Sequence, residues 1–142
     1  MVILAAGHPI VPGEVQGSLL LSHTPLSLWG GIDPKTGFII DQRHDRTGES
    51  VVGKILAIPS EKGSSTGSAV LLELVRIGKA PAAIITCTLA PILALGSIIA
   101  RELYDVSLPI LLVSVDAFAA LSDGDRINIE SDGTISSLEQ FD

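Results

Sequence analysis

The stretch from Gly63 to Ser68, GSSTGS, places four hydroxyl side chains just before an expected helix. The spacing of apolar residues predicts that amphipathic helix over residues 69–79. The first turn of a helix has unpaired N–H groups and a partial positive charge. Hydroxyls placed there can bind an anionic group or, once activated, act as a base or nucleophile. Ser64, Ser65 or Thr66 could instead simply cap the helix, and both interpretations stay open at this point.

Other polar residues stand where a site could include them. Asp41 and His44 lie in a polar loop, where they could form an acid/base pair, contact a substrate, or only hold the loop together. Lys54 interrupts an apolar run, so its ammonium either reaches solvent or points into a cleft toward a carboxylate or phosphate. Cys87 has no nearby cysteine or histidine and is expected to be a buried small residue rather than a metal ligand.

The elements that must position these residues alternate between strands and helices. Apolar strands that neighbour helices favour parallel pairing with both faces covered, so we expect one compact α/β domain over residues 1–142 with an additional β layer. Thr88 is expected to cap a second helix that is apolar almost all round and therefore largely buried. Strands are predicted at Glu14–Ser22, Phe38–Asp41, Ser50–Ile58, Pro81–Thr86 and Leu108–Ser114, a hairpin at Arg126–Glu130 and Thr134–Ser137, and helices at Ala69–Lys79 and Leu89–Tyr104, with a helical turn at Ala117–Leu121.

The composition of the chain excludes some classes of protein. The chain of 142 residues is 46% hydrophobic and only 18% charged, with a mean hydropathy of +0.50. Such values indicate either a large aliphatic core or an apolar face that a partner covers. The net charge of −7 and the scattered lysines and arginines argue against nucleic-acid binding. A single cysteine excludes an internal disulfide and makes the cytoplasm the expected compartment.

One uncharged segment is long enough to span a membrane but is not continuously apolar. Residues 80–100 carry no charge, yet Pro81, Pro91 and Gly96 interrupt them, and the polar run Thr86–Thr88 divides them. Split at that run, the segment predicts a buried strand followed by a helix. We therefore expect no membrane partner.

Three ordered motifs resemble the swivel domain, or small subunit, of the aconitase X family. They cover nearly the whole chain and use unusual residues in a fixed order. The matching stretches are Gly30–Lys54, with its Gly30-Gly31-Ile32-Asp33-Pro34 start and its His44 and Gly53-Lys54 positions, then Pro59–Ser68 with Gly63-Ser64-Ser65, and Gly78–Ile85.

This resemblance implies the swivelling β/β/α fold of the aconitase superfamily and the dehydration of a β-hydroxy acid. It implies a larger partner subunit, whose cysteines hold an iron–sulfur cluster that acts as Lewis acid on the leaving hydroxyl. No metal would be held by this chain. The superfamily role of proton-abstracting base falls on Ser64, with Ser65, Thr66, Ser68, His44 and Lys54 as candidate substrate contacts. A serine can act so only where its alkoxide is stabilised, for example by helix N-terminal amides.

The sequence departs from the wider superfamily at Thr66, where an arginine that contacts substrate carboxylate would stand. Binding specificity therefore does not transfer from the resemblance. A second similarity, to the mobile phosphohistidine domain of phosphoenolpyruvate-utilising enzymes, rests on Ala100–Leu103, Leu108-Pro109 and Leu121–Asp125. Its phosphorylated histidine would fall at Leu95, which cannot carry a phosphoryl group. That similarity supports the fold and argues against that function.

Two hypotheses of different classes follow. The first is the small subunit of a two-subunit hydro-lyase, with cis-3-hydroxy-L-proline as the expected substrate and mevalonate 5-phosphate as the alternative. The region from Ile92 to Tyr104 is more similar to bacterial members that act on the former. The second hypothesis is a non-catalytic swivel-type module whose apolar face docks on another protein.

Overall fold

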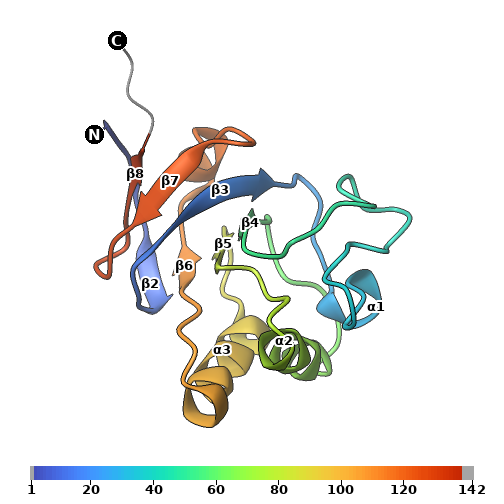
Figure 1. The fold of residues 1–142 in the computed structure, drawn as a ribbon. Coiled ribbons are helices and arrows are strands. Elements are labelled where there is room, and N and C mark those ends of the chain that lie inside the picture. The colour runs from blue at the N-terminus through green and yellow to red at the C-terminus, as the bar shows by residue number, and fades with distance from the viewer. Residues whose placement is uncertain (1, 139–142) are drawn as a thin grey trace.

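The computed structural model describes residues 2–138 as one mixed sheet with helices on both faces (Figure 1). Along the sheet the strand order is β1-β8-β7-β3-β4-β5-β6-β2. The strands are β1 (Val2–Ala6), β2 (His8–Val11), β3 (Val15–Leu21), β4 (Ile55–Ala57), β5 (Ala83–Thr86), β6 (Ile110–Leu112), β7 (Arg126–Ile129) and β8 (Thr134–Ser137), and the helices are α1 (Leu28–Gly31), α2 (Gly67–Arg76), α3 (Pro91–Tyr104) and α4 (Val115–Ala119).

Strand β3 joins the parallel and antiparallel parts of the sheet. Its first half, residues 15–18, pairs antiparallel with β7, and its second half, residues 19–21, pairs parallel with β4. Strands β4, β5 and β6 continue the parallel part. The expected parallel pairing and the expected β7–β8 hairpin are therefore confirmed.

Two apolar cores lie on opposite faces of the parallel strands. Because side chains alternate along a strand, Leu56 of β4 faces one core while Ile55 and Ala57 face the other. The first core is covered by α2 and α3, and the second by strands β1, β7 and β8 together with Phe118 of the short helix α4. This arrangement, helices over a parallel sheet with a further β layer beneath it, is the predicted α/β fold with its added β layer.

Helix α3 differs from its prediction in two ways. The Thr88 cap is wrong, because the N-cap position is Ala90 and the helix starts at Pro91. The helix is also only partly buried, since Leu95 and Ile98 are each 51% exposed. Helix α3 packs closely on α2 at Gly96. A Cβ added to Gly96 would lie only 3.2 Å from the Ser68 carbonyl oxygen, so the absence of a side chain there permits the close approach. When a helix is apolar on all sides, its sequence does not show which face packs. In α3 the face that points away from α2 has no covering element among residues 2–138.

Two expected strands are shorter than predicted. Residues 50–58 form only the three-residue β4, because a turn at Val51–Lys54 uses the backbone that would have extended it. Residues 38–41 form isolated bridges, Ile39 with Ile32 and Phe38 with Ser50, in place of a strand.

The amino-terminal strands β1 and β2 were not predicted. They follow each other with only Gly7 between them, yet they lie at opposite ends of the strand order. The sheet must therefore curl until its two end strands meet at Gly7, whose N–H donates to the Gly133 carbonyl oxygen. No helix within residues 2–138 is long and apolar enough to cross a membrane.

Candidate functional site

The candidate site lies in the loops that follow the parallel strands. In open α/β sheets, ligands bind outside the carboxyl ends of parallel strands, because the loops there converge. The loop after β4, residues 58–66, carries Ser64 and runs beside the segment that follows β3. The two are joined by a parallel bridge between Leu26 and Glu61, by Leu26 N–H to the Ser60 carbonyl (3.3 Å), and by Lys62 N–H to the Leu26 carbonyl (3.2 Å).

Ser64 sits in a tight turn immediately before α2. Its hydroxyl oxygen accepts the Thr66 N–H at 3.1 Å, and its carbonyl oxygen accepts the Gly67 N–H at 2.9 Å. Gly63 enters the turn with a φ of +87°, a backbone conformation that side-chain-bearing residues rarely adopt. The backbone thus aims an amide N–H at the Ser64 oxygen, which is the contact that an alkoxide would need.

The neighbouring hydroxyls are arranged differently from simple helix caps. Helix α2 begins at Gly67, two residues before the predicted Ala69, and Thr66 occupies the N-cap position without a side-chain cap bond. The Ser68 hydroxyl donates to the Ser65 carbonyl oxygen at 2.8 Å. Within residues 2–138, the exposed Ser65 and Thr66 side chains make no hydrogen bond. Both hydroxyls are therefore available to a ligand beside Ser64.

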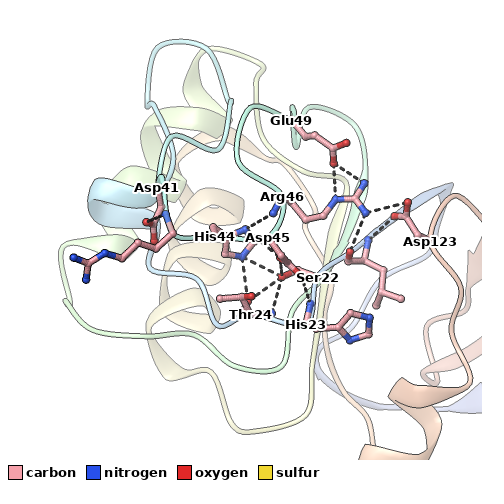
Figure 2. Close-up of polar contacts among 11 residues, drawn as sticks. Ser22, His23, Thr24, Asp41, His44, Asp45, Arg46, Glu49 and Asp123 are labelled. Carbon is pink, nitrogen blue, oxygen red and sulfur yellow. Dashed lines mark hydrogen bonds and ion pairs between the residues drawn. The ribbon is translucent and has the colours of Figure 1, made fainter.

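His44 lies in the interior, 3% exposed, as part of a hydrogen-bonded cluster (Figure 2). Its Nε2 is 3.1 Å from both the Ser22 hydroxyl and the Thr24 carbonyl oxygen, and its Nδ1 accepts the Arg46 N–H at 3.1 Å. An accepting Nδ1 assigns the proton of the neutral ring to Nε2. Asp41 does not contact the His44 ring within residues 2–138; its carboxylate accepts the Arg43 N–H instead. The geometry favours the loop-holding interpretation of His44.

Lys54 lies beside a different hollow from the Ser64 turn. Its exposed side chain, with Arg46, Ser50 and Asp123, lines a depression of about 440 Å³ whose wall does not include Ser64. A second depression of about 430 Å³ is lined by Ser60, Thr88 and their neighbours at the carboxyl ends of β4 and β5. Of the predicted site residues, the structure therefore gathers Ser64, Ser65, Thr66 and Ser68 and places His44 and Lys54 elsewhere.

Two acidic residues anchor the loop that holds His44. Burial would raise the pKa of Asp45, but hydrogen bonds from the Ser22 hydroxyl and the His23 N–H outweigh it, so this pKa is lowered. The pKa of Asp123 is lowered as well. Burial alone would raise it, but the hydrogen bond that its carboxylate accepts from the Leu21 N–H and its ion pair with Arg46 outweigh burial. These bonds tie residues 44–46 to the end of β3.

Acid should weaken this anchoring. Because the folded-state pKa values of Asp45 and Asp123 lie below their unfolded value of about 3.9, their contribution to stability is present above that pH. It is lost as the pH falls through the folded-state values. We expect the urea midpoint of the wild-type chain to fall more steeply between about pH 5 and 2 than that of Asp45→Asn. Parallel curves for the two proteins would contradict this assignment.

Glu61 is a site residue that the sequence analysis missed. Its Oε1 accepts the Ile92 N–H at 3.0 Å and its Oε2 accepts the Leu93 N–H at 2.9 Å, both in the first turn of α3. These partners lie 31 and 32 positions away, so no local pattern could have revealed them. A carboxylate three residues before Ser64 was the only available signal.

The fold and the hydroxyl-rich turn together are typical of one class of domain. A β/β/α domain that carries a hydroxyl-rich turn at the carboxyl ends of its parallel strands is a swivel-type domain. The family model of the aconitase X swivel domain matches residues 4–137, and the chain belongs to that family. This confirms both the predicted resemblance and the predicted fold.

Relatives carry two different names. The chain is 45% identical over 136 residues to a cis-3-hydroxy-L-proline dehydratase of Pseudomonas aeruginosa, covering 91% of this chain and 23% of that protein. It is 41% identical over 126 residues to a phosphomevalonate dehydratase small subunit of Thermococcus gammatolerans, covering 89% and 90%. The crystal structure of Thermococcus kodakaraensis aconitase X in its holo-form matches with a TM-score of 0.84 at 38% identity, over 95% of this chain and 98% of that one. The chain thus spans about a quarter of the hydroxyproline dehydratases and most of the small subunits.

The chain's own side chains do not suit an iron–sulfur cluster. Within residues 2–138 no three histidine, cysteine or acidic side chains gather in a way that could hold a metal ion. Cys87, the only cysteine of the sequence, is half-buried, and burial raises the pKa of its thiol, which disfavours the thiolate that ligates iron.

Proposed function

We propose that this chain is the swivel-domain subunit of an aconitase X-type dehydratase and that Ser64 is the base that removes the carbon-bound proton of a β-hydroxy acid. The observation that carries this proposal is the hydrogen bond from the Thr66 N–H to the Ser64 oxygen at the start of α2. That amide and the helix dipole both favour negative charge on this oxygen. Membership in the aconitase X swivel-domain family supports the assignment.

The two halves of the reaction fall on different chains in this proposal. Ser64, as the alkoxide, takes the proton from the carbon next to the substrate carboxylate. The hydroxyl on the adjacent carbon leaves from the side of a larger partner subunit, to which we also assign the iron–sulfur cluster. Loss of that proton and that hydroxyl balances as one water. The single cysteine supports a cytoplasmic location for the complex.

Ser65, Thr66 and Ser68 are the proposed substrate contacts on this chain. The first two have hydroxyls that bond nothing within residues 2–138 and flank Ser64, so either can donate to a substrate carboxylate. Thr66 stands where the superfamily arginine is expected, and a neutral hydroxyl cannot hold a carboxylate as strongly as a guanidinium does. We infer that the main cationic contact comes from the partner subunit, because Lys54, the candidate cation on this chain, lines a hollow that does not include Ser64.

The proposed substrate is cis-3-hydroxy-L-proline, with mevalonate 5-phosphate as the alternative. The identity to the Pseudomonas aeruginosa dehydratase, 45%, supports the first, and matches of 37–41% to phosphomevalonate dehydratase small subunits support the second. We expect the complex of this chain with a large subunit encoded in the same genome to dehydrate cis-3-hydroxy-L-proline at least about 100-fold faster, in kcat/KM, than mevalonate 5-phosphate.

A spectrophotometric assay with both compounds measures this preference. The inverse preference would replace the proposed substrate with its alternative and leave the role of Ser64 in place. Turnover of neither compound, by a complex that assembles and carries its cluster, would favour the non-catalytic docking module, for which the exposed apolar face of α3 is the supporting feature.

A further inference from the structure

We propose that Glu61 is a positioning residue for Ser64, because its carboxylate ties the loop that carries Ser64 to the first turn of α3. The inference rests on the proposed function, in which Ser64 is the base. In this inference the charge and the side-chain length of Glu61 determine the position of Ser64. Glu61 does not touch the Ser64 side chain, so its effect must pass through the loop backbone.

Both oxygens of the Glu61 carboxylate are used in this contact. Pro91 opens α3 and has no N–H, so the amides of Ile92 and Leu93 are the first donors that the helix offers. Glu61 accepts both, at 3.0 and 2.9 Å. The N-cap residue Ala90 has no side chain that could replace it. A negative charge at the positive end of this 14-residue helix is also stabilised by the helix dipole.

The contact is transmitted to Ser64 over a short and well-anchored path. Leu26 holds the backbone on both sides of Glu61, because its N–H donates to the Ser60 carbonyl oxygen and its carbonyl oxygen accepts the Lys62 N–H. Only Lys62 and Gly63 separate Glu61 from Ser64, and a Cβ on Gly63 would lie 3.4 Å from the Ser27 hydroxyl oxygen. The loop is therefore pinned by its neighbour on one face and by α3 on the other.

The beginnings of α2 and α3 are also in direct contact. A Cβ on Gly67, the first residue of α2, would lie 3.3 Å from the Ile92 side chain. Movement of the first turn of α3 would therefore move the turn that contains Ser64 and its Thr66 N–H donor. The Glu61 carboxylate already binds the free N–H groups at the start of α3. The helix N-terminus beside Ser64 that can still bind a ligand is therefore the start of α2.

The test is made on the two-subunit enzyme with Glu61→Ala and Glu61→Gln. We expect Glu61→Ala to lower kcat by about 10- to 100-fold with KM changed less than about threefold, because misplacement of a base affects the chemical step. Glu61→Gln keeps one acceptor oxygen but loses the charge, so its kcat should lie between. Added acetate, which matches the carboxymethyl group that the substitution removes, should restore part of the kcat of Glu61→Ala.

Glu73→Ala is the matched control and should leave kcat unchanged, since within residues 2–138 the Glu73 carboxylate pairs with Arg76 alone, on the exposed side of α2. An unchanged kcat in Glu61→Ala, in an enzyme that Ser64→Ala inactivates, would overturn the positioning role while leaving the proposed function intact. A loss of kcat in Glu61→Ala that equals the loss in Glu73→Ala, without rescue by acetate, would also overturn it.

A second measurement does not depend on activity. In the chain alone, amide hydrogen exchange at Ile92 and Leu93, followed by NMR, should be at least about tenfold faster in Glu61→Ala than in the wild type. The Ser64, Ser65 and Thr66 amide resonances should shift in the same variant. Unchanged exchange and unchanged shifts would overturn the inference, even if Ser64 proved not to be the base.

Discussion

We expect Ser64→Ala to lower the kcat of the proposed two-subunit enzyme by about 10²- to 10⁴-fold, the range for loss of a general base. The methyl group that replaces the hydroxyl cannot accept a proton, and the Thr66 N–H that now points at the serine oxygen would have no acceptor there. Steady-state kinetics on the purified complex, with KM and kcat measured separately, tests this expectation.

Assembly and binding should survive the same substitution. Ser64 is half-buried in a surface turn, so the chain should fold and pair with the proposed large subunit as before. Ser131→Ala, at an exposed position in the β7–β8 turn, is the matched control and should keep full activity. A Ser64→Ala enzyme within about tenfold of wild-type kcat would exclude Ser64 as the base.

We expect His44→Ala to destabilise the chain by about 3 kcal/mol, which is a large share of the stability of a small domain. The substitution removes a buried ring and leaves the Arg46 N–H without its acceptor. It also removes one partner each from the Ser22 hydroxyl and the Thr24 carbonyl, which still bond to each other. A loss of this size corresponds to a fall of roughly 10 °C in Tm for a domain of this length. Thermal unfolding followed by circular dichroism measures it.

The same variant separates the two interpretations of His44. If the ring only holds the loop, enzyme assayed well below its Tm should keep its KM, whereas a substrate contact would raise KM. His8→Ala is the control, because His8 is exposed on β2 and should leave Tm within about 1 °C of the wild type. A stable His44→Ala chain with a raised KM would restore the substrate-contact interpretation.

Local patterns were sufficient for much of the fold. The apolar runs at β4 and β5 and the turn residues between β7 and β8 act over a few positions, so their strands and pairing were predictable. Strands β1 and β2 were missed because their partners, β8 and β6, lie about a hundred or more residues away and leave no local mark. The exposed face of α3 was missed because an all-apolar helix does not identify its packing side.

The site was predictable to a similar degree. The hydroxyl-rich turn before α2 combines a glycine, serines and a helix start within six residues, which marked the turn but left capping open, and only the family resemblance singled out Ser64. The roles of Glu61 and His44 depend on hydrogen bonds to α3 and to the end of β3, which only the folded chain brings near. For Lys54 the sequence left open whether the side chain reaches solvent or a cleft, and the structure shows an exposed side chain beside a hollow whose wall does not include Ser64.

The meeting of the two end strands at Gly7 has a consequence for synthesis. Val2 pairs with Ser137 and His8 pairs with Leu112, so β1 and β2 leave the ribosome long before their partners exist. The parallel strands and their helices can collapse first, but the sheet cannot close until β8 has emerged. Such distant pairing predicts slow, late folding of the amino terminus and a nascent chain whose first strands need protection from other chains.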